Sequence, residues 1–233
     1  WAESDALCIK TDATGRVVWQ KTYGGYVEDK FEEIVQLKDG SFLVGGSTGS
    51  AGPGKTNVWL AKMNAGGSLL WQRQYGMRVT NASVEFRLWG VFLTRENDYF
   101  VFGERKLTFS TGIWYTDAWC GRIRQNGSVA WSCLLSPGAF CAFRNAQQTS
   151  DGGFILEGDT GTVVEGTTKT WDAYCVKINP KGAVEWAAAY DWTDADYGSG
   201  GVRQTSDGGF VLAGHTRLDD SDTEAWLIKT NAK

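Results

Sequence analysis

Apolar residues occupy both faces of most short β-like segments in this chain. In the stretch Ser206–Gly214 (SDGGFVLAG), Phe210 and Leu212 alternate with Val211 and Ala213, which are apolar as well. An open antiparallel sheet with one face in water would instead alternate apolar and polar residues. We therefore expect strands that are covered on both sides by other sheets.

The same stretch recurs along the chain. Its aromatic residue returns at intervals of 57, 55 and 56 residues, at Phe42, Tyr99, Phe154 and Phe210. No long run has helical periodicity. A period in this range, carried by strand-like segments, is typical of architectures built from repeated β-sheets.

A second repeated strand ends on a cation, as in Trp59–Lys62 (WLAK) and Trp226–Lys229 (WLIK). A tryptophan follows nine residues after each of four such cations, and the pairs are Lys10 and Trp19, Lys62 and Trp71, Arg122 and Trp131, and Lys177 and Trp186. Turn residues lie between the members of each pair, including the glycines Gly15, Gly66, Gly127 and Gly182, which predicts short β connections. The spacing predicts hairpins in which cation and indole face each other as a cation–π pair.

The repeat predicts one all-β domain over residues 1–233, a β-propeller of four-stranded antiparallel blades. We expect seventeen strands, with blades at about residues 27–76, 84–136, 142–191 and 198–233. Because four blades need only sixteen strands, the economical solution is a four-bladed ring closed by the N-terminal strands within residues 5–24. Five blades with incomplete ends and an excerpt of a larger propeller are the alternatives.

Three segments resemble a known repeat family. They are Thr205–Thr216 (TSDGGFVLAGHT), Ala225–Asn231 (AWLIKTN) and Gly15–Gly25 (GRVVWQKTYGG), and they are similar to the kelch-like propeller repeats of many secreted archaeal and bacterial surface proteins. The resemblance implies an extracellular or cell-surface location and carries no catalytic signature. The second repeat departs from it most, because Glu96–Asp98 replaces the Asp-Gly-Gly turn.

Composition narrows the range of partners. Thirty glycines, three prolines and twelve tryptophans fit an all-β domain. A formal charge of −4 gives no reason to expect nucleic acid as a partner. No run of about 18 apolar residues is present, so we expect no insertion into a membrane.

Five cysteines cannot all pair within one chain. Three of them occupy the repeat position that holds leucine elsewhere, which favours small buried hydrophobic residues. If Arg122 faces Trp131, then Cys120 faces Cys133. A disulfide between these two strands can then form in an oxidising compartment.

Strand direction places the long loops and the crossovers between blades on one rim, opposite the tight Asp-Gly and Asn-Gly turns. Binding residues concentrate in long loops on rigid scaffolds, so this long-loop rim is the candidate functional face. We expect it to carry Tyr26, Phe109, Trp114, Tyr115, Phe140, Trp192 and Tyr197. Exposed aromatic side chains suit sugar rings or a protein partner. The alternative is that they pack the crossovers onto the blades.

The same rim carries acidic residues. The last long loop contains Asp219, Asp220, Asp222 and Glu224, and the crossover before it contains Asp191, Asp194 and Asp196. Oxygen ligands in flexible loops suit Ca²⁺, although the spacing matches no EF-hand loop. A calcium site and simple solvation are both open, and no other cofactor is expected.

Catalytic patterns are weak. Gly45–Gly49 (GGSTG) matches the Gly-x-Ser-x-Gly pattern, but no helix follows it, and the chain has one histidine, His215. Residues that could supply a carboxylate pair for glycoside hydrolysis are Glu32, Glu33, Glu85, Glu104, Glu157 and Asp159.

The leading hypothesis is a non-catalytic binding or surface-structural module that recognises a glycan or a protein. One alternative is a propeller glycoside hydrolase or polysaccharide lyase. Another is a self-assembling subunit, a homo-oligomer that pairs through unpaired blade edges.

Overall fold

The computed structural model describes residues 4–164, 167–191, 195–217 and 222–231. Seventeen strands lie in this part of the chain, as the repeats predict. They are β1 (Ala6–Thr11), β2 (Val17–Tyr23), β3 (Asp29–Gln36), β4 (Phe42–Thr48), β5 (Asn57–Met63), β6 (Leu69–Tyr75), β7 (Ala82–Leu93), β8 (Tyr99–Phe109), β9 (Trp114–Ile123), β10 (Val129–Leu135), β11 (Phe140–Gln148), β12 (Phe154–Val164), β13 (Thr167–Ile178), β14 (Val184–Tyr190), β15 (Asp196–Gln204), β16 (Phe210–Arg217) and β17 (Thr223–Lys229). The described part contains no helix long and apolar enough to cross a membrane.

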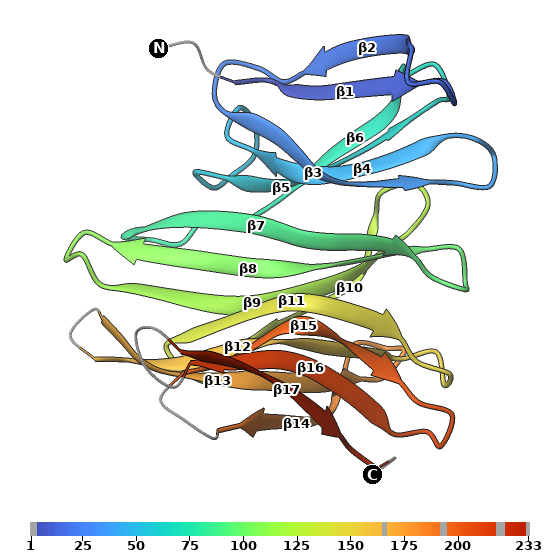
Figure 1. The fold of residues 1–233 in the computed structure, drawn as a ribbon. Helices are drawn as coiled ribbons and strands as arrows, with labels where there is room; N and C mark the ends of the chain where they lie inside the picture. The colour runs from blue at the N-terminus through green and yellow to red at the C-terminus, as the bar shows by residue number, and fades with distance from the viewer. Residues whose placement is uncertain (1–3, 165–166, 192–194, 218–221, 232–233) are drawn as a thin grey trace.

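Consecutive strands pair antiparallel within each repeat. Strands β1 and β2 form a two-stranded sheet, β3 to β6 a four-stranded sheet and β15 to β17 a three-stranded sheet. Strands β7 to β14 form one eight-stranded sheet, because Phe140 of β11 pairs in parallel with Thr116 of β9. Figure 1 shows β1–β2, the β3–β6 sheet and the start of the eight-stranded sheet one above another, with β15–β17 overlapping β11–β13 in this view.

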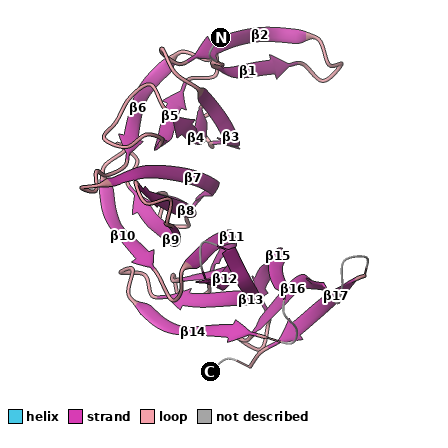
Figure 2. Ribbon diagram, turned by 90° about the vertical axis from the view of Figure 1, so that its left-hand side faces the viewer, coloured by secondary structure: helices cyan, strands magenta, loops and turns pink. Residues whose placement is uncertain are grey.

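The predicted closed ring of four-stranded blades is wrong for the described strands, which form no closed propeller. Only β3 to β6 make a separate four-stranded sheet, and β1 and β2 pair only with each other. Figure 2 shows an open arc with the two termini at its ends. The physical reason is packing: Ala6 and Cys8 of β1 are buried against Trp59 and Met63 of β5, which holds the N-terminal hairpin at one end of the stack.

Apolar clusters between successive layers cover both faces of the sheets, as the hydrophobic pattern predicts. In β4, the adjacent residues Leu43 and Val44 are both buried although they point to opposite faces. The cluster within the eight-stranded sheet contains Phe100 and Phe154, whose ring centroids lie 3.9 Å apart in a stacked pair. Burial of such rings is the main favourable contribution to folding.

The first strand of each repeat carries a β-bulge at the same place. The pairing register shifts by one residue at Glu32 in β3, at Trp89 in β7 and at Arg144 in β11. In β15 the shift lies between Tyr197 and Gly201. A bulge leaves the extra residue outside the ladder and redirects its side chain.

The bulges explain the glycine that recurs within each second strand, four residues after its first aromatic residue. A Cβ atom on Gly158 would lie 1.9 Å from the carbonyl oxygen of Ala142, and one on Gly103 would lie 2.0 Å from that of Arg87. Both obstacles are backbone atoms, which cannot rotate away as a flexible side chain does. The same clash occurs at Gly46, where the obstacle is the carbonyl oxygen of Lys30.

The tight turns use the Asx residues that the pattern predicts, with one correction. The side-chain oxygen of Asn64 accepts hydrogen bonds from the backbone amides of Gly66 and Ser68 at 3.0 and 2.9 Å. The positive φ angle falls on Gly67, at 78°, and not on Gly66. The predicted glycines Gly15, Gly127 and Gly182 do have positive φ.

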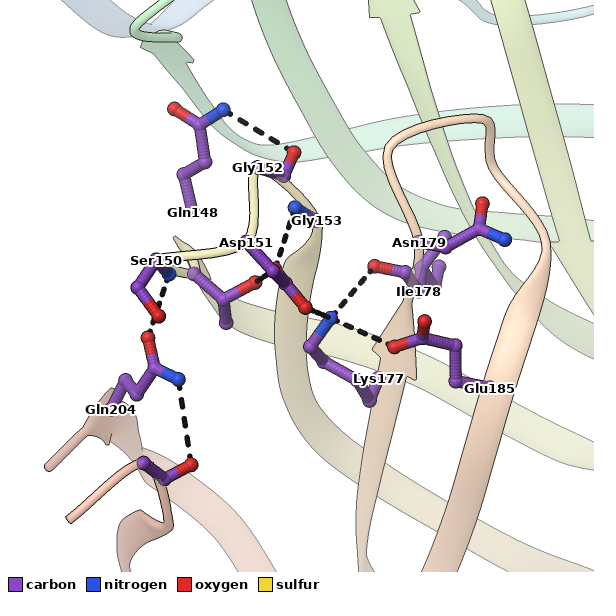
Figure 3. A network of polar contacts seen from close by, with 12 residues as sticks. Gln148, Ser150, Asp151, Gly152, Gly153, Lys177, Ile178, Asn179, Glu185 and Gln204 are labelled. Atoms are coloured by element: carbon purple, nitrogen blue, oxygen red, sulfur yellow. Dashed lines mark hydrogen bonds and ion pairs between the residues drawn. The ribbon is translucent and has the colours of Figure 1, made fainter. Parts of the chain in front are cut away.

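The predicted register of cation and indole is confirmed in all four hairpins. The cation–π contacts of the described residues do not include these pairs, however. In the hairpin of β13 and β14, the Nζ atom of Lys177 instead lies 2.9 Å from the carboxylates of both Asp151 and Glu185 (Figure 3). Lys229 forms the equivalent ion pair with Asp207 at 2.7 Å. The cation therefore pairs with the aspartate of the Asp-Gly turn, because an ion pair is available within the same sheet.

The indoles connect neighbouring repeats. The Nε1 atom of Trp19 donates to the backbone oxygen of Ala65 at 3.0 Å, and that of Trp131 donates to Pro180 at 3.1 Å. On the same rim, the backbone amide of Ser150 donates to the Gln204 side chain at 2.7 Å (Figure 3). These hydrogen bonds thus join turns of one repeat to the next repeat.

We expect Gly158→Ala to lower the free energy of unfolding by about 2 kcal/mol or more, because the added methyl group meets the Ala142 carbonyl oxygen. Gly66→Ala is the matched control, since its Cβ would meet only the Asn64 side chain at 3.5 Å. In urea unfolding, the free energy of unfolding of this control should stay within about 0.5 kcal/mol of that of the unmodified chain. Equal losses of unfolding free energy in the two variants would contradict the contact between Gly158 and the Ala142 carbonyl oxygen.

Candidate functional site

A charged cleft of about 270 Å³ opens between the β3–β6 sheet and strands β7 and β8. We call it the rim cleft, and its charged residues are Glu28, Lys30, Lys55, Glu85, Arg87, Glu104 and Lys106. They come from the starts of β3 and β7, from the end of β8 and from the loop between β4 and β5. These are the ends that strand direction assigns to the long-loop rim, so the cleft lies on the predicted functional face.

The loop between β4 and β5 closes one side of the rim cleft. Asn57 is fully buried, and its side-chain oxygen accepts a hydrogen bond from the Gly54 amide at 2.9 Å. The loop also bonds to the neighbouring sheet, since Lys55 donates its backbone N–H to Val84 at 2.9 Å and Phe86 donates to Thr56 at 2.9 Å. This side of the rim cleft is held by backbone hydrogen bonds between the two sheets.

Ion pairs line the rim cleft. Lys55 and Glu85 lie 2.8 Å apart, and Arg87 and Glu104 lie 3.3 Å apart across β7 and β8. Lys106 follows at the end of β8, and its ammonium group lies 5.4 Å from the ring centroid of Trp114. The walls therefore present both donors and acceptors of strong hydrogen bonds.

The bulged strands bring a second group of charges beside the rim cleft. Arg144 lies 3.5 Å from Glu104 and 3.2 Å from Asp159, so one guanidinium joins carboxylates of β8 and β12. Trp89 lies between two cations, with Arg144 at 4.4 Å and Arg87 at 5.4 Å from its ring. We call these five residues the inner cluster. Two of them, Trp89 and Arg144, are the bulge residues themselves, so the bulges build this group.

Burial changes the acidity of carboxyl groups along the same strands. It raises the pKa of Glu32, although Lys30 and Arg87 oppose the shift, and it raises the pKa of Glu33. It also raises the pKa of Asp159 despite the attraction of Arg144. The largest effect is at Glu157, where burial and then the charge of Asp159 raise the pKa to about 8.

Glu157 and Asp159 hold the irregular part of β15. The amide of Gly201 donates to Glu157 at 3.1 Å, and the amide of Gly198 donates to Asp159 at 2.9 Å. Glu157 has no exposed surface, and its Oε1 atom has no hydrogen-bond partner. These carboxyl groups hold the backbone of β15, and neither of them lines the rim cleft.

The predicted rim aromatics separate into two groups. Phe109, Trp114 and Tyr115 lie on the β8–β9 hairpin, where Phe109 and Tyr115 meet edge to face at 6.1 Å. They belong to strands and not to a long loop, because β8 and β9 continue to a tight turn with Gly112 at positive φ. Tyr115 is 43% exposed.

The second aromatic group lies at the other end of the arc. Tyr197 stacks on His215 at 5.0 Å and lies 5.7 Å from Trp171, which contacts the buried Phe140 at 4.4 Å. Sequence analysis did not select Trp171, although an aromatic residue on β13 facing the crossover was a usable signal. Tyr26 stands apart at 92% exposure, and Trp192 lies outside the described residues.

The calcium prediction stays a prediction. Asp194, Asp219 and Asp220 lie outside the described residues, and within the described ones no three metal-ligating side chains gather. Asp196 is fully buried at the start of β15. Burial and the charges of Asp191 and Asp196 raise the pKa of Asp172, so these acidic groups do act on one another.

The Gly-x-Ser-x-Gly match does not form a catalytic site with the histidine. Ser47 lies in β4 and lines the rim cleft, whereas His215 lies in β16 against Tyr197. Cys120 and Cys133 face each other across β9 and β10, as predicted, and both are free thiols.

A second cavity of about 520 Å³ lies between β5–β6 and β9–β10. Its walls are mainly apolar and include Tyr75, Phe86 and Trp119. The ion pair of Arg105 and Asp117 lies at its side, with Nε 2.9 Å from the carboxylate. Sequence analysis does not predict this cavity, because its walls come from separate sheets.

We expect Glu157→Gln to stabilise the protein at alkaline pH. The folded chain keeps a proton on Glu157 up to a pH of about 8, whereas the unfolded chain releases it near pH 4.3. The stabilising effect of the neutral carboxyl group is therefore complete below about pH 4.3 and is lost as the pH rises through about 8. Glutamine stays neutral and can still accept the Gly201 hydrogen bond.

The free energy of unfolding of Glu157→Gln should exceed that of the unmodified chain by about 1 kcal/mol or more at pH 8, and the gain should shrink towards pH 4. Glu224→Gln removes the same charge from an exposed position and serves as the control. A Glu157→Gln variant that is less stable than the unmodified chain at pH 8 would show that the pKa of Glu157 is not raised in the folded chain.

Comparison with known proteins assigns no family. No protein-family model matches the chain, and no curated protein matches it. The function proposed below therefore rests on the geometry of the rim.

Proposed function

We propose that this chain is a non-catalytic binding module whose long-loop rim recognises a glycan. The observation that carries the proposal is the rim cleft, whose Lys106 holds its ammonium group over the ring of Trp114. Sugar recognition needs an apolar ring face together with hydrogen-bonding groups of fixed direction. Trp114 supplies the first, and the ion-paired side chains of the rim cleft supply the second.

The rigidity of the site supports this function. Lys106 lies over the Trp114 ring, and the cleft wall is held by hydrogen bonds between two sheets. A preformed site loses little conformational entropy on binding, which favours affinity for a flexible oligosaccharide. A protein partner at the same rim is the alternative occupant.

The repeated bulge, glycine and turn aspartate support a finer proposal for the architecture. We take each set of consecutive strands as one blade of a propeller-type repeat, in which Gly46, Gly103 and Gly158 meet the inner strand in the same way. The resemblance to kelch-like surface proteins supports an extracellular or cell-surface location. Self-assembly along an unpaired edge also stays a proposal, to which the 73% exposure of Leu227 on β17 is relevant.

An enzymatic function is the weaker candidate. Glu104 and Asp159 both form ion pairs with Arg144, so their carboxylates are engaged within the protein. Glu157 has the raised pKa that a catalytic acid needs, but its side chain is fully buried behind β15. Glu157 and Asp159, whose pKa values are raised, are therefore both buried and closed to a substrate.

Trp114→Ala should weaken oligosaccharide binding about tenfold or more, which corresponds to about 1.4 kcal/mol. An array of neutral and acidic oligosaccharides would first select a ligand, and titration calorimetry would then give its affinity. Leu227→Ala, an exposed apolar position on β17, should bind as the unmodified chain does.

Two results would contradict the proposal. One is unchanged affinity in Trp114→Ala, and the other is the absence of any oligosaccharide ligand on the array. Release of new reducing ends from the bound oligosaccharide would instead support the glycosidase alternative.

A further inference from the structure

Two thiols face each other across the β9–β10 hairpin. Cys120 of β9 is the direct pairing partner of Cys133 of β10. All five cysteines lie in the described residues, and the other three face different residue types: Cys8 pairs with Lys21, Cys141 with Thr160, and Cys175 with Glu157 and Ala188. The pair is therefore a distinct feature of this hairpin.

The two thiols differ in access to solvent. Cys120 has no exposed surface and belongs to the apolar cluster that contains Phe100 and Tyr174. Cys133 is partly exposed and packs on the same cluster from its margin. A reagent from solvent can therefore reach Cys133 first, with Cys120 directly behind it.

The contact between Cys120 and Cys133 also makes Cys133 the more reactive of the two thiols. Cys120 donates a hydrogen bond to the Cys133 sulfur and thereby lowers the pKa of Cys133 to about 7. Burial raises the pKa of Cys120, Cys8 and Cys175, and it raises that of Cys141 to about 12. Thiolates are the nucleophilic form of cysteine, so reactivity concentrates at one position.

We infer that Cys133 is an oxidation site for hydroperoxides and that Cys120 converts the oxidised form into a cross-strand disulfide. In the first step, the Cys133 thiolate sulfur attacks the peroxide oxygen, the O–O bond breaks, and a sulfenic acid and an alcohol or water result. In the second step, the Cys120 sulfur attacks the Cys133 sulfur, the S–O bond breaks, and the hydroxyl leaves as water with the Cys120 proton. Two electrons pass from the thiol pair to the hydroperoxide.

The backbone geometry suits the second step. Directly opposed residues in antiparallel strands have Cα atoms about 4.5–5.5 Å apart, which lies within the range of about 4.4–6.8 Å found for disulfides. The disulfide can therefore form without separation of β9 from β10. It would join β10, an outer strand of the eight-stranded sheet, covalently to β9, with which it pairs.

The test uses the complete chain, fully reduced and then freed of reductant. Treatment with hydrogen peroxide, followed by unfolding and maleimide labelling, should leave three of the five thiols reactive. Peptide mapping should show a cross-link between Cys120 and Cys133, and dithiothreitol should remove it. In Cys120→Ala, dimedone should label a sulfenic acid at Cys133, because the resolving thiol is absent.

Cys175→Ala is the matched control, since it removes a buried cysteine that faces no other cysteine. It should form the Cys120–Cys133 cross-link at the rate of the unmodified chain. Five reactive thiols in peroxide-treated chain, or oxidation of Cys133 to sulfinic acid without a cross-link, would overturn the inference. Circular dichroism identifies any variant that fails to fold, and the peptide map of the unmodified chain then decides.

Discussion

The close approach of one backbone to another at a glycine is the contact on which this structure depends. At the bulge of β11, the carbonyl oxygen of Ala142 occupies the space that a side chain at position 158 would need. β3 and β7 make the same contact with Gly46 and Gly103. The contact excludes every residue except glycine there, and the bulge in turn places Trp89 and Arg144 outside the regular ladder. One constraint thus accounts for both a repeated residue and the inner cluster beside the rim cleft.

Pairing within sheets was predictable because it depends on local spacing. The nine-residue separation of Lys177 and Trp186 predicts their cross-strand register, and the same sum of residue numbers that pairs Arg122 with Trp131 pairs Cys120 with Cys133. Features that depend on competition between contacts were not predictable in this way. Lys177 pairs with carboxylates instead of the indole, and the N-terminal hairpin packs on Trp59 instead of closing a ring.

The predicted site residues stay a prediction, and the structure brings only some of them near the rim cleft. Trp114 lies next to Lys106, which lines that cleft. The sequence analysis did not select Arg144, because its ion pairs with Glu104 and Asp159 depend on a bulge that no local sequence motif predicts. Three glutamines at one repeat position, Gln36, Gln148 and Gln204, were a readable signal, and two of them accept backbone hydrogen bonds from the neighbouring turn.

Nuclear Overhauser contacts between α-protons test the central constraint most directly. The position of a Cβ atom on Gly158 lies 2.9 Å from the Cα atom of Phe143, and on Gly46 it lies 2.7 Å from that of Phe31. The account predicts strong contacts between the α-protons of Gly158 and Phe143 and between those of Gly46 and Phe31, with Glu157 opposite Asn145. A continuous register, in which Glu157 is opposite Arg144 and no bulge exists, would contradict it.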